Sequence, residues 1–457
     1  MLFHTWTFAV FFLIVWLGYL LVRRTPLAMP WLLAASYFFY GAWAPLYLLL
    51  VIYSTLIDYT AVWLMARTRF RKTWLTLSLI NNLGLLGLFK YSGFLIENIN
   101  ETLRAGGVGY ELEDPGFLLP VGISFYTFQS MSYTIDYFRG RIEIEPNLIR
   151  FAAYVSLFPQ LVAGPIERAE SLLPQLRRCP SPKMADVAEG LGLFELGLFK
   201  KVALANYLAL YVDPIYGNVE AYDGATLALA TMAFSWQIYF DFSGYSDMAR
   251  GVARCFGFRL MVNFRHPYLA VSLSDFWARW HISLSQWFRD YVYIPLGGNR
   301  CGSVRVAFNL LVTFLLSGVW HGAAWTFVVW GLWHGFGVVG ERWLSRVAFW
   351  NRMPKALRSI GIYGFVCVGW VFFRSESMAD AMTVFGRIFG AEGIWKMAPV
   401  WMLIVLVVVV IYQWLVESRF RYGLQKPLVT IPLAVLMLLY LMTAPGSDAQ
   451  PFIYFQF

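Results

Sequence analysis

The chain has 457 residues, of which 59% are hydrophobic and only 14% are charged. A soluble domain carries roughly 25% charged residues, so this composition excludes an ordinary soluble globular protein and indicates a chain that crosses a membrane several times. The net charge of +9 does not indicate nucleic-acid binding, because the basic residues lie in short clusters between apolar runs. We found no linker or repeat and therefore expect one membrane domain, residues 1–457.

Apolar runs of membrane-spanning length alternate with basic clusters along the chain. The first run is followed, not preceded, by two arginines, which is the reverse of a secretory signal, so we expect an uncleaved span. From the basic clusters we predict that Thr68–Lys72 and Arg342–Arg358 are cytoplasmic and that Met1 and Phe457 lie outside. The predicted spans are about residues 6–22, 30–43, 46–66, 74–96, 117–138, 188–212, 225–248, 306–321, 323–340, 359–373, 398–416 and 428–443.

Two stretches do not fit a simple crossing. Residues 151–165 (FAAYVSLFPQLVAGP) are short, contain two prolines and have basic residues on both sides, which predicts a re-entrant hairpin, with an ordinary short helix as the alternative. Residues 260–305 combine arginines with many aromatic side chains, which is typical of helices in the cytoplasmic interface or dipping into the membrane. The predicted fold class is an all-α polytopic membrane protein with about 11–12 transmembrane helices plus re-entrant and interfacial helices.

His321 is the first candidate for chemistry. It ends an apolar run that starts near residue 306, and fifteen helical residues rise about 22 Å through a hydrocarbon core of about 30 Å. An ionisable group at that depth is a functional-site candidate. Its small neighbours Gly318, Gly322 and Ala323 either leave room for substrates or form a helix-packing surface. The alternative is a histidine satisfied by one interhelical hydrogen bond.

Two further histidines lie near the same stretch. His281, in WARWHISLS, is expected to line the same cavity from the other side, and imidazoles suit proton transfer near neutral pH. His334, in GLWHG, is expected to be a packing or lining residue. No cysteine, aspartate or glutamate falls at ligand spacing beside His281 or His321, so we expect no metal. The four cysteines likewise indicate neither a zinc site nor a disulfide framework.

The predicted span 225–248 is too polar to face lipid. Its polar side chains either line a cavity or proton path or form a buried structural network. Asp241 and Asp247 need partners, which we expect to be the arginines that follow. The arginines of residues 260–305 either meet an anionic donor such as coenzyme A or only reflect topology. The candidates for a substrate or donor tunnel are Gln237, Tyr239, Asp241, Ser243, Tyr245, Asn263, Trp277, Arg279, Trp280, Arg289, Trp320 and His334.

Taken together, the motifs resemble the membrane-bound O-acyltransferase superfamily and, within it, the alginate O-acetylation branch. The resemblance covers essentially the whole chain. The motifs that carry it are LPVGISFYTFQ (119–129), FPQLVAGPI (158–166), GLFKK (197–201), YFDFSGYSD (239–247), DFWARWHISLSQWFRDYVYIPLGGNR (275–300), SGVWHGAAW (317–325) and the terminal FIYFQF.

The resemblance implies roles and partners that the residues alone do not give. His321 matches the superfamily's catalytic histidine, and His281 matches its second histidine position. The implied architecture is a ring of tilted helices around a central tunnel that opens to the cytoplasm. The implied activity moves acetyl groups from acetyl-CoA across the bacterial inner membrane onto an exported polysaccharide, without a permanently bound cofactor. An external SGNH-hydrolase-like partner would complete the transfer.

Two other functions stay open at this point. The protein could act alone on a lipid or peptidoglycan acceptor, or it could be a transporter without covalent chemistry. No inverted repeat is visible in the sequence, which disfavours the transporter. For the acyltransferase we expect His321 to act as the general base and His281 to orient the donor or substrate.

Overall fold

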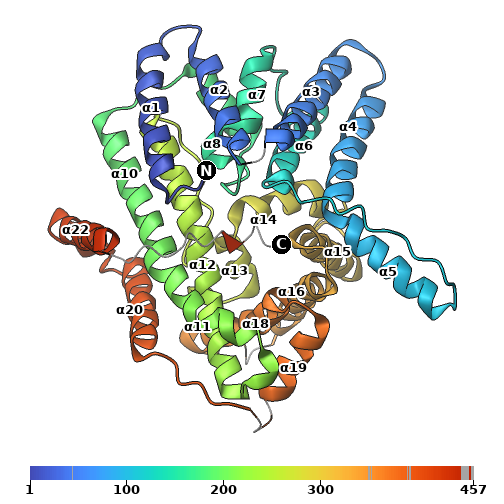
Figure 1. Ribbon diagram of the computed structural model, residues 1–457, viewed down its shortest axis with the longest axis vertical. Coiled ribbons are helices and arrows are strands. Elements are labelled where there is room, and N and C mark those ends of the chain that lie inside the picture. Colours follow the sequence, from blue (N-terminus) through green and yellow to red (C-terminus); the bar gives the residue numbers. More distant parts are fainter. Residues whose placement is uncertain are drawn as a thin grey trace. The chain divides into compact units, whose positions relative to one another are not determined.

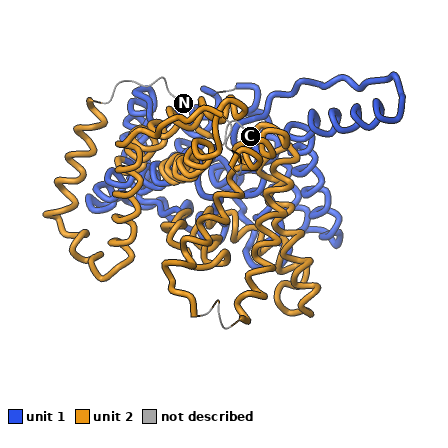
Figure 2. The backbone as a smooth tube through the Cα atoms, turned by 90° about the horizontal axis from the view of Figure 1, so that it is seen from below, with its two compact units in different colours: residues 1–194, 246–261 blue, residues 195–245, 262–457 orange. Residues whose placement is uncertain are grey.

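The computed structural model describes residues 1–43, 45–347, 350, 352–388, 390, 393–443 and 452–453. Within these residues the regular elements are helices, apart from one isolated bridge between Tyr222 and Ile394 (Figure 1). The chain divides into two compact units, residues 1–194 with 246–261 and residues 195–245 with 262–457 (Figure 2). The all-α class is confirmed, whereas the single domain 1–457 stays a prediction.

Residues 1–194 of the first unit contain helices that follow the predicted apolar runs. Asp58 is wholly buried in the first unit and shows how these helices are joined: it accepts hydrogen bonds from Ser78 (2.6 Å), Asn82 (2.9 Å) and Ser130. These residues come from three neighbouring helices, α3, α4 and α6. The helices are α1 (Trp6–Val22), α2 (Ala28–Gly41), α3 (Pro45–Arg67), α4 (Arg71–Leu86), α5 (Ser92–Ala105), α6 (Ile123–Phe138), α7 (Leu148–Ser156), α8 (Phe158–Leu161), α9 (Ala169–Arg178) and α10 (Met184–Phe199), the last of which continues into the second unit.

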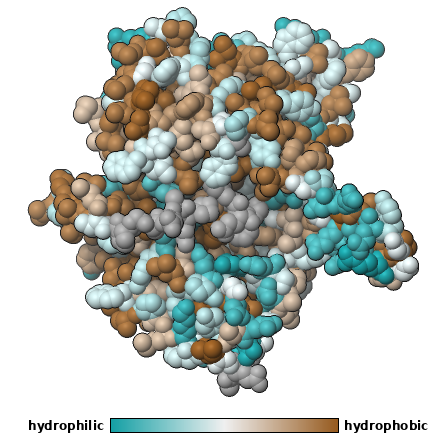
Figure 3. Space-filling model, in the orientation of Figure 1, coloured by the Kyte–Doolittle hydropathy of each residue, from teal (hydrophilic) through white to brown (hydrophobic). Residues whose placement is uncertain are grey.

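One helix runs further than the sequence predicted. The span predicted to end near residue 96 continues through a π-helical turn, Gly87–Tyr91, into α5. Asn98 and Thr102 donate side-chain hydrogen bonds to backbone carbonyls four residues earlier, so polar side chains replace apolar ones without ending the helix. Hydrophilic surface gathers over the place of α5 in Figure 3, consistent with the polar, acidic character of the predicted external loop.

The predicted re-entrant segment is a broken helix inside the first unit. Helix α7 ends before Leu157, whose backbone leaves the helical region (ψ 115°), and the four-residue α8 follows. The Phe158 backbone N–H donates to the Ser36 hydroxyl (3.1 Å), which satisfies a donor exposed by the break. The segment is therefore built of two short buried helices, and the prediction that its two ends lie on the same side of the membrane stays a prediction.

The second unit contains the other candidate residues. Helix α12 (Gly224–Cys255) is continuous over 32 residues and contributes residues 224–245 to this unit. The other α-helices of more than four residues in the described part of this unit are α11 (Asn206–Tyr216), α13 (Leu273–Arg279), α14 (Ile282–Phe288), α15 (Ser303–His321), α16 (Trp325–Leu344), α18 (Lys355–Arg374), α19 (Met378–Ile388), α20 (Val400–Glu417) and α22 (Pro427–Thr443). Shorter elements join them, including α21 (Arg421–Leu424) and π-helical turns at Lys200–Ala205 and Arg289–Tyr293. Helix α19 was not predicted.

The helices have the surface of a membrane protein. In the described part of the chain, five are long and apolar enough to cross a membrane by length and composition: Pro45–Arg67, Arg71–Ala105, Ser303–His321, Lys355–Arg374 and Val400–Glu417. Hydrophobic side chains cover much of the face shown in Figure 3. Such a surface is stable only against lipid, so the protein is a multi-pass membrane protein. The number of 11–12 crossings and the central tunnel stay predictions, and the predicted location of Phe457 falls outside the described residues.

Candidate active site

Helices α15 and α16 form a hairpin that fixes the position of His321. A Cβ atom added to Gly331 would lie 2.5 Å from the Phe314 carbonyl oxygen, and one added to Gly318 would meet the Phe327 carbonyl oxygen and lie 3.0 Å from the Gly331 Cα. The two helices therefore pack backbone to backbone, which only glycine permits. A Cβ on Gly322 would overlap the Phe327 ring. The idea that Gly318 and Gly322 leave room for substrates is therefore wrong, and the helix-packing alternative is confirmed.

His321 is the last residue of α15 and lies inside a shell of aromatic rings. Its side chain is buried, and its ring centroid is 5.0 Å from Trp320, 4.9 Å from Trp330 and 5.4 Å from Phe373. The His281 ring lies 6.4 Å away. The structure thus brings together two histidines that are 40 positions apart in the sequence, and the prediction that they line one cavity stays a prediction. Surroundings of this kind exclude water from a reacting group.

The backbone at His281 is held in an unusual conformation. Its φ is +43°, in the left-handed region that costs a residue with a side chain roughly 1–2 kcal/mol. Asn263 holds the turn: its side-chain oxygen accepts hydrogen bonds from the Ser283 N–H (3.1 Å) and hydroxyl (3.0 Å) and lies 3.3 Å from His281 Nδ1. Its backbone carbonyl accepts from the Ile282 N–H (2.9 Å). Asn263, a predicted site residue, therefore positions His281.

His281 lies before α14, outside the five long apolar helices, and is wholly buried. The Phe242 ring lies perpendicular to its imidazole at a centroid distance of 4.7 Å. Burial lowers the pKa of His281 to about 3, because the charged imidazolium would lose its hydration. The ring is therefore neutral at ordinary pH, which suits a hydrogen-bonding and orienting role better than an electrostatic one.

Helix α16 positions other parts of this site through Trp330, His334 and Glu341, which are spaced four and seven residues apart. Trp330 packs against both His321 and His334, with both centroids at 4.9 Å. Two turns further on, Glu341 accepts hydrogen bonds from the backbone N–H groups of Leu273 (2.7 Å) and Ser274 (3.2 Å). A carboxylate at the start of a helix satisfies free N–H groups and the helix dipole, so Glu341 anchors α13, whose C-terminal end leads directly to His281.

Sequence reasoning missed Trp330 and Glu341. Trp330 could have been noticed because it lies four positions before His334, on the same helical face. Glu341 could have been noticed as a carboxylate that directly follows an apolar run. The partner of Glu341, the first turn of α13, is 67 or more residues away and leaves no local signal.

The polar stretch of α12 forms a network with one unexpected partner. Asp241 pairs with Lys201 (2.6 Å), not with a following arginine, and also accepts from the Ile453 N–H (2.7 Å). That expectation was wrong because Lys201 reaches Asp241 from the π-helical turn that precedes α11. The expectation for Asp247 is confirmed within the first unit, where Asp247 pairs with Arg250 at 3.0 Å. The network supports the structural alternative for this stretch.

The other tunnel candidates fall into two groups. The arginines have carboxylate partners: Arg279 pairs with Asp275 (2.7 Å) and Glu417 (2.5 Å), and the exposed Arg289 pairs with Asp290 (2.8 Å). Their contact with a donor stays a prediction. The candidates that lie in the second unit as buried or partly buried side chains are Gln237, Tyr239, Ser243, Tyr245, Trp277, Trp280, Trp320 and His334.

Aromatic contacts link several of these side chains. Trp280 packs on Trp370 (5.0 Å) and on Tyr239 (6.3 Å), and Trp277 packs on His334 (5.0 Å). Across the described ranges, no three histidine, cysteine, aspartate or glutamate side chains are grouped so that they could hold a metal ion. At this site His281 and His321 supply two imidazoles within an aromatic shell, and imidazole is a side chain that suits proton transfer.

Comparison with known proteins identifies the reaction class. The MBOAT, membrane-bound O-acyltransferase family, matches residues 46–378, a range that contains both His281 and His321. The chain belongs to the membrane-bound O-acyltransferase family. It is 39% identical over 405 residues to the probable alginate O-acetylase AlgI of Pseudomonas aeruginosa, a match that covers 87% of this chain and 76% of the relative.

Two further relatives differ in the acceptor that their names state. A peptidoglycan O-acetyltransferase of Helicobacter pylori is 35% identical over 430 residues, covering 86% of this chain and 81% of the relative. A teichoic acid D-alanyltransferase of Bacillus subtilis is 28% identical over 288 residues, covering 56% and 69%. The family and these relatives show that this protein is a membrane O-acyltransferase, and they leave its acceptor undetermined.

Proposed function

We propose that this membrane-bound O-acyltransferase takes acetyl groups from acetyl-CoA at the cytoplasmic side of the bacterial inner membrane and delivers them for O-acetylation of an exported polysaccharide. The observation that carries the proposal is the pairing of His321 with His281, 6.4 Å apart inside an aromatic shell, in a chain of this family. The similarity to a probable alginate O-acetylase favours a polysaccharide acceptor.

His321 acts as the general base in the proposed reaction. The acceptor hydroxyl oxygen attacks the thioester carbonyl carbon while His321 accepts the hydroxyl proton. The carbon–sulfur bond then breaks, and the proton passes to the sulfur, which gives free coenzyme A and an acetyl ester. A positioned base contributes about 10²–10⁴-fold to such a step. His281, neutral and held through Nδ1 by Asn263, orients the donor or the acceptor through Nε2.

The hydroxyl that attacks belongs either to the polymer itself or to an external SGNH-hydrolase-like partner that passes the acetyl group on. A peptidoglycan acceptor is the second candidate, and the Helicobacter pylori relative favours it. A transporter without covalent chemistry finds no support, since the named relatives are transferases or an acetylase.

The test uses the purified protein in liposomes with acetyl-CoA carrying a radiolabelled acetyl group. Release of free coenzyme A thiol reports consumption of the donor, and base-labile label on added alginate or peptidoglycan fragments reports the acceptor. The same assay is run with and without a periplasmic extract of the source cells, which would supply a partner. We expect thiol release to require His321 and label to appear on the polysaccharide. Failure to consume acetyl-CoA under all these conditions would refute the proposed donor.

A further inference from the structure

His334 is wholly buried, yet neither of its ring nitrogens has a hydrogen-bond partner among the residues that the structure describes. The same holds for the indole N–H groups of Trp277 and Trp330. The three rings are in mutual contact: the centroid distances are 5.0 Å for Trp277–His334, 4.9 Å for Trp330–His334 and 5.8 Å for Trp277–Trp330. Buried polar nitrogens therefore gather at one place.

Such a group is uncommon because buried polar atoms in proteins are nearly always hydrogen-bonded. Each unpaired nitrogen carries a desolvation cost that folding does not offset unless another group supplies a partner. An indole nitrogen can only donate, and a neutral imidazole donates once and accepts once. The cluster thus offers three donors and one acceptor, which matches a ligand rich in carbonyl oxygens that also has an N–H group.

The surroundings of the cluster select for a neutral ligand. The other rings around His334 are those of Phe276, Phe314 and Phe365. A charged group held among them would lose its hydration without compensation. Gly369 of α18 faces the imidazole: a Cβ atom there would lie 2.8 Å from His334 Nε2. The α18 backbone at Gly369 therefore packs directly against the imidazole, and a larger residue there would have to displace it.

Trp330 connects this cluster to the proposed catalytic base, because the same indole ring also packs on His321 at 4.9 Å. We propose that His334, Trp277 and Trp330 bind the neutral amide- and carbonyl-bearing arm of the thioester donor and hold its acyl end beside His321. The inference rests on the proposed function, since it needs an acyl thioester as the donor. It makes His334 a determinant of donor binding and not only a packing residue.

The test uses the full-length protein and the acetyl thioester of N-acetylcysteamine, which carries the amide and the thioester but no nucleotide. His334→Phe keeps an aromatic ring and removes both nitrogens, and Trp330→Phe removes one N–H. We expect His334→Phe to raise the KM for this thioester about 3- to 10-fold for each hydrogen bond lost, with a smaller change in kcat. His334→Gln, which can still donate and accept, should recover part of the loss.

Trp333→Phe is the matched control on the same helix. Its indole N–H already donates to the Phe365 carbonyl oxygen (3.0 Å), so its loss should affect stability and leave the KM for the thioester unchanged. If His334→Phe folds poorly, Gly369→Ala tests the same site by pressing a methyl group against Nε2 and displacing the imidazole, and it should also raise the KM.

Two outcomes overturn the inference. If His334→Phe and Gly369→Ala keep the wild-type KM and lower only the melting temperature, the nitrogens serve a buried water or the packing alone. If the wild-type protein uses neither this thioester nor acetyl-CoA, the proposed function fails, and this inference falls with it. The first outcome leaves the proposed function intact, so the two failures are distinguishable.

Discussion

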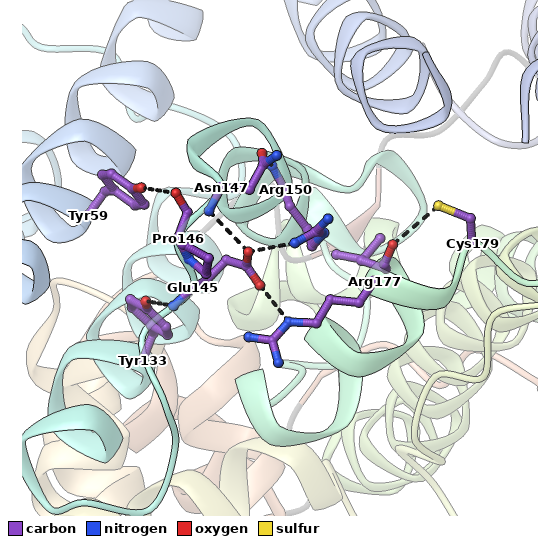
Figure 4. A network of polar contacts seen from close by, with 9 residues as sticks. Tyr59, Tyr133, Glu145, Pro146, Asn147, Arg150, Arg177 and Cys179 are labelled. Carbon is purple, nitrogen blue, oxygen red and sulfur yellow. Dashed lines mark hydrogen bonds and ion pairs between the residues drawn. The ribbon is translucent and has the colours of Figure 1, made fainter. Parts of the chain in front are cut away.

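Two buried polar clusters, one in each compact unit, differ in how their polar atoms are used. In the first unit, Glu145 is wholly buried, and both of its carboxylate oxygens are paired: one with Arg150 (2.7 Å) and the Asn147 N–H (3.1 Å), the other with Arg177 (2.8 Å). Figure 4 shows the two arginines directed at this carboxylate from α7 and α9. In the second unit, His334 uses neither nitrogen within the described residues.

The difference separates structural polar groups from chemical ones. The Tyr133 hydroxyl accepts from the Glu145 N–H (2.9 Å), and the Tyr59 hydroxyl donates to the Pro146 carbonyl (2.7 Å), so the loop before α7 is tied to two further helices. A cluster that is complete within the protein holds the fold together. The rings of Trp277, Trp330 and His334 leave hydrogen-bonding capacity for a substrate. Four predictions test this contrast.

The first prediction concerns catalysis at His321. His321→Gln keeps polarity and most of the side-chain volume but removes the base, so acetyl transfer should fall about 10²–10⁴-fold. The melting temperature of the detergent-solubilised protein should stay close to that of the wild type. His4→Gln, which removes a histidine outside the site, is the control. Transfer within about threefold of wild type at normal membrane levels would show that His321 is only a packing residue.

The second prediction concerns stability at Glu145. Glu145→Ala removes the carboxylate that Arg150 and Arg177 share. Both arginines are partly exposed and can rehydrate, so we expect a loss of about 1–3 kcal/mol and not the larger value for a fully buried pair. Thermal unfolding followed by size-exclusion chromatography measures the loss, with the exposed Glu143→Ala as control. Normal stability combined with lost turnover per folded molecule would contradict the structural role.

The third prediction concerns Glu341, a structural carboxylate whose loss should affect acetyl transfer. Glu341→Gln keeps the shape but weakens the charge-assisted bonds to the Leu273 and Ser274 N–H groups, which loosens the start of α13. Because α13 leads to His281, acetyl transfer should fall about 3- to 10-fold, as the loss of roughly one hydrogen bond implies. The exposed Glu376→Gln is the control. Wild-type transfer by Glu341→Gln would show that α13 needs no anchor.

The fourth prediction uses pH and a second buried carboxyl group of the first unit. Burial raises the pKa of Glu167 to about 7 from 4.5, although the Met261 N–H, which donates to it at 2.5 Å, opposes the rise. The folded state therefore retains a proton that the unfolded state releases. This contribution to stability is fully present below pH 4.5 and is lost as the pH rises through 7.

Glu167→Gln should remove this dependence. From pH 6.5 to 7.5 the wild type should lose about 0.7 kcal/mol that the variant retains, measured as the difference between their unfolding curves at the two pH values. Glu145→Gln provides the comparison, because the arginines around Glu145 require a charged carboxylate and this variant should be destabilised at both pH values. Identical pH dependence of wild type and Glu167→Gln would contradict the prediction.

Most of the helices and the two catalytic candidates could be predicted from the sequence. The signals differ between the helices and the candidates. The helices follow from apolar runs, whose length and composition act locally. The pairing of His281 with His321 was expected from motifs, and the structure places the rings together through Asn263 and the aromatic shell. Helix α5 was missed because its polar residues lack an apolar signal although they still form a helix.

The partners of buried charges could not be predicted. Asp241 is paired with Lys201, forty positions earlier, and with the Ile453 N–H, more than two hundred positions later. Such contacts depend on which helices pack together, and local sequence does not record that. The same limit hid the anchoring of α13 by Glu341. Gly318 was ambiguous for a related reason: a small residue permits either a cavity or a close contact, and only the neighbouring backbone decides.

The contact between the backbones at Gly318 and Gly331 has a mechanical consequence. Helices that touch at one level without an intervening layer of side chains cannot approach further there, so we expect α15 and α16 to move together. His321 and Trp330 therefore keep a constant separation while the protein fluctuates. We therefore expect any opening that admits a donor or releases a product to occur in segments other than this hairpin, with His321 held in place.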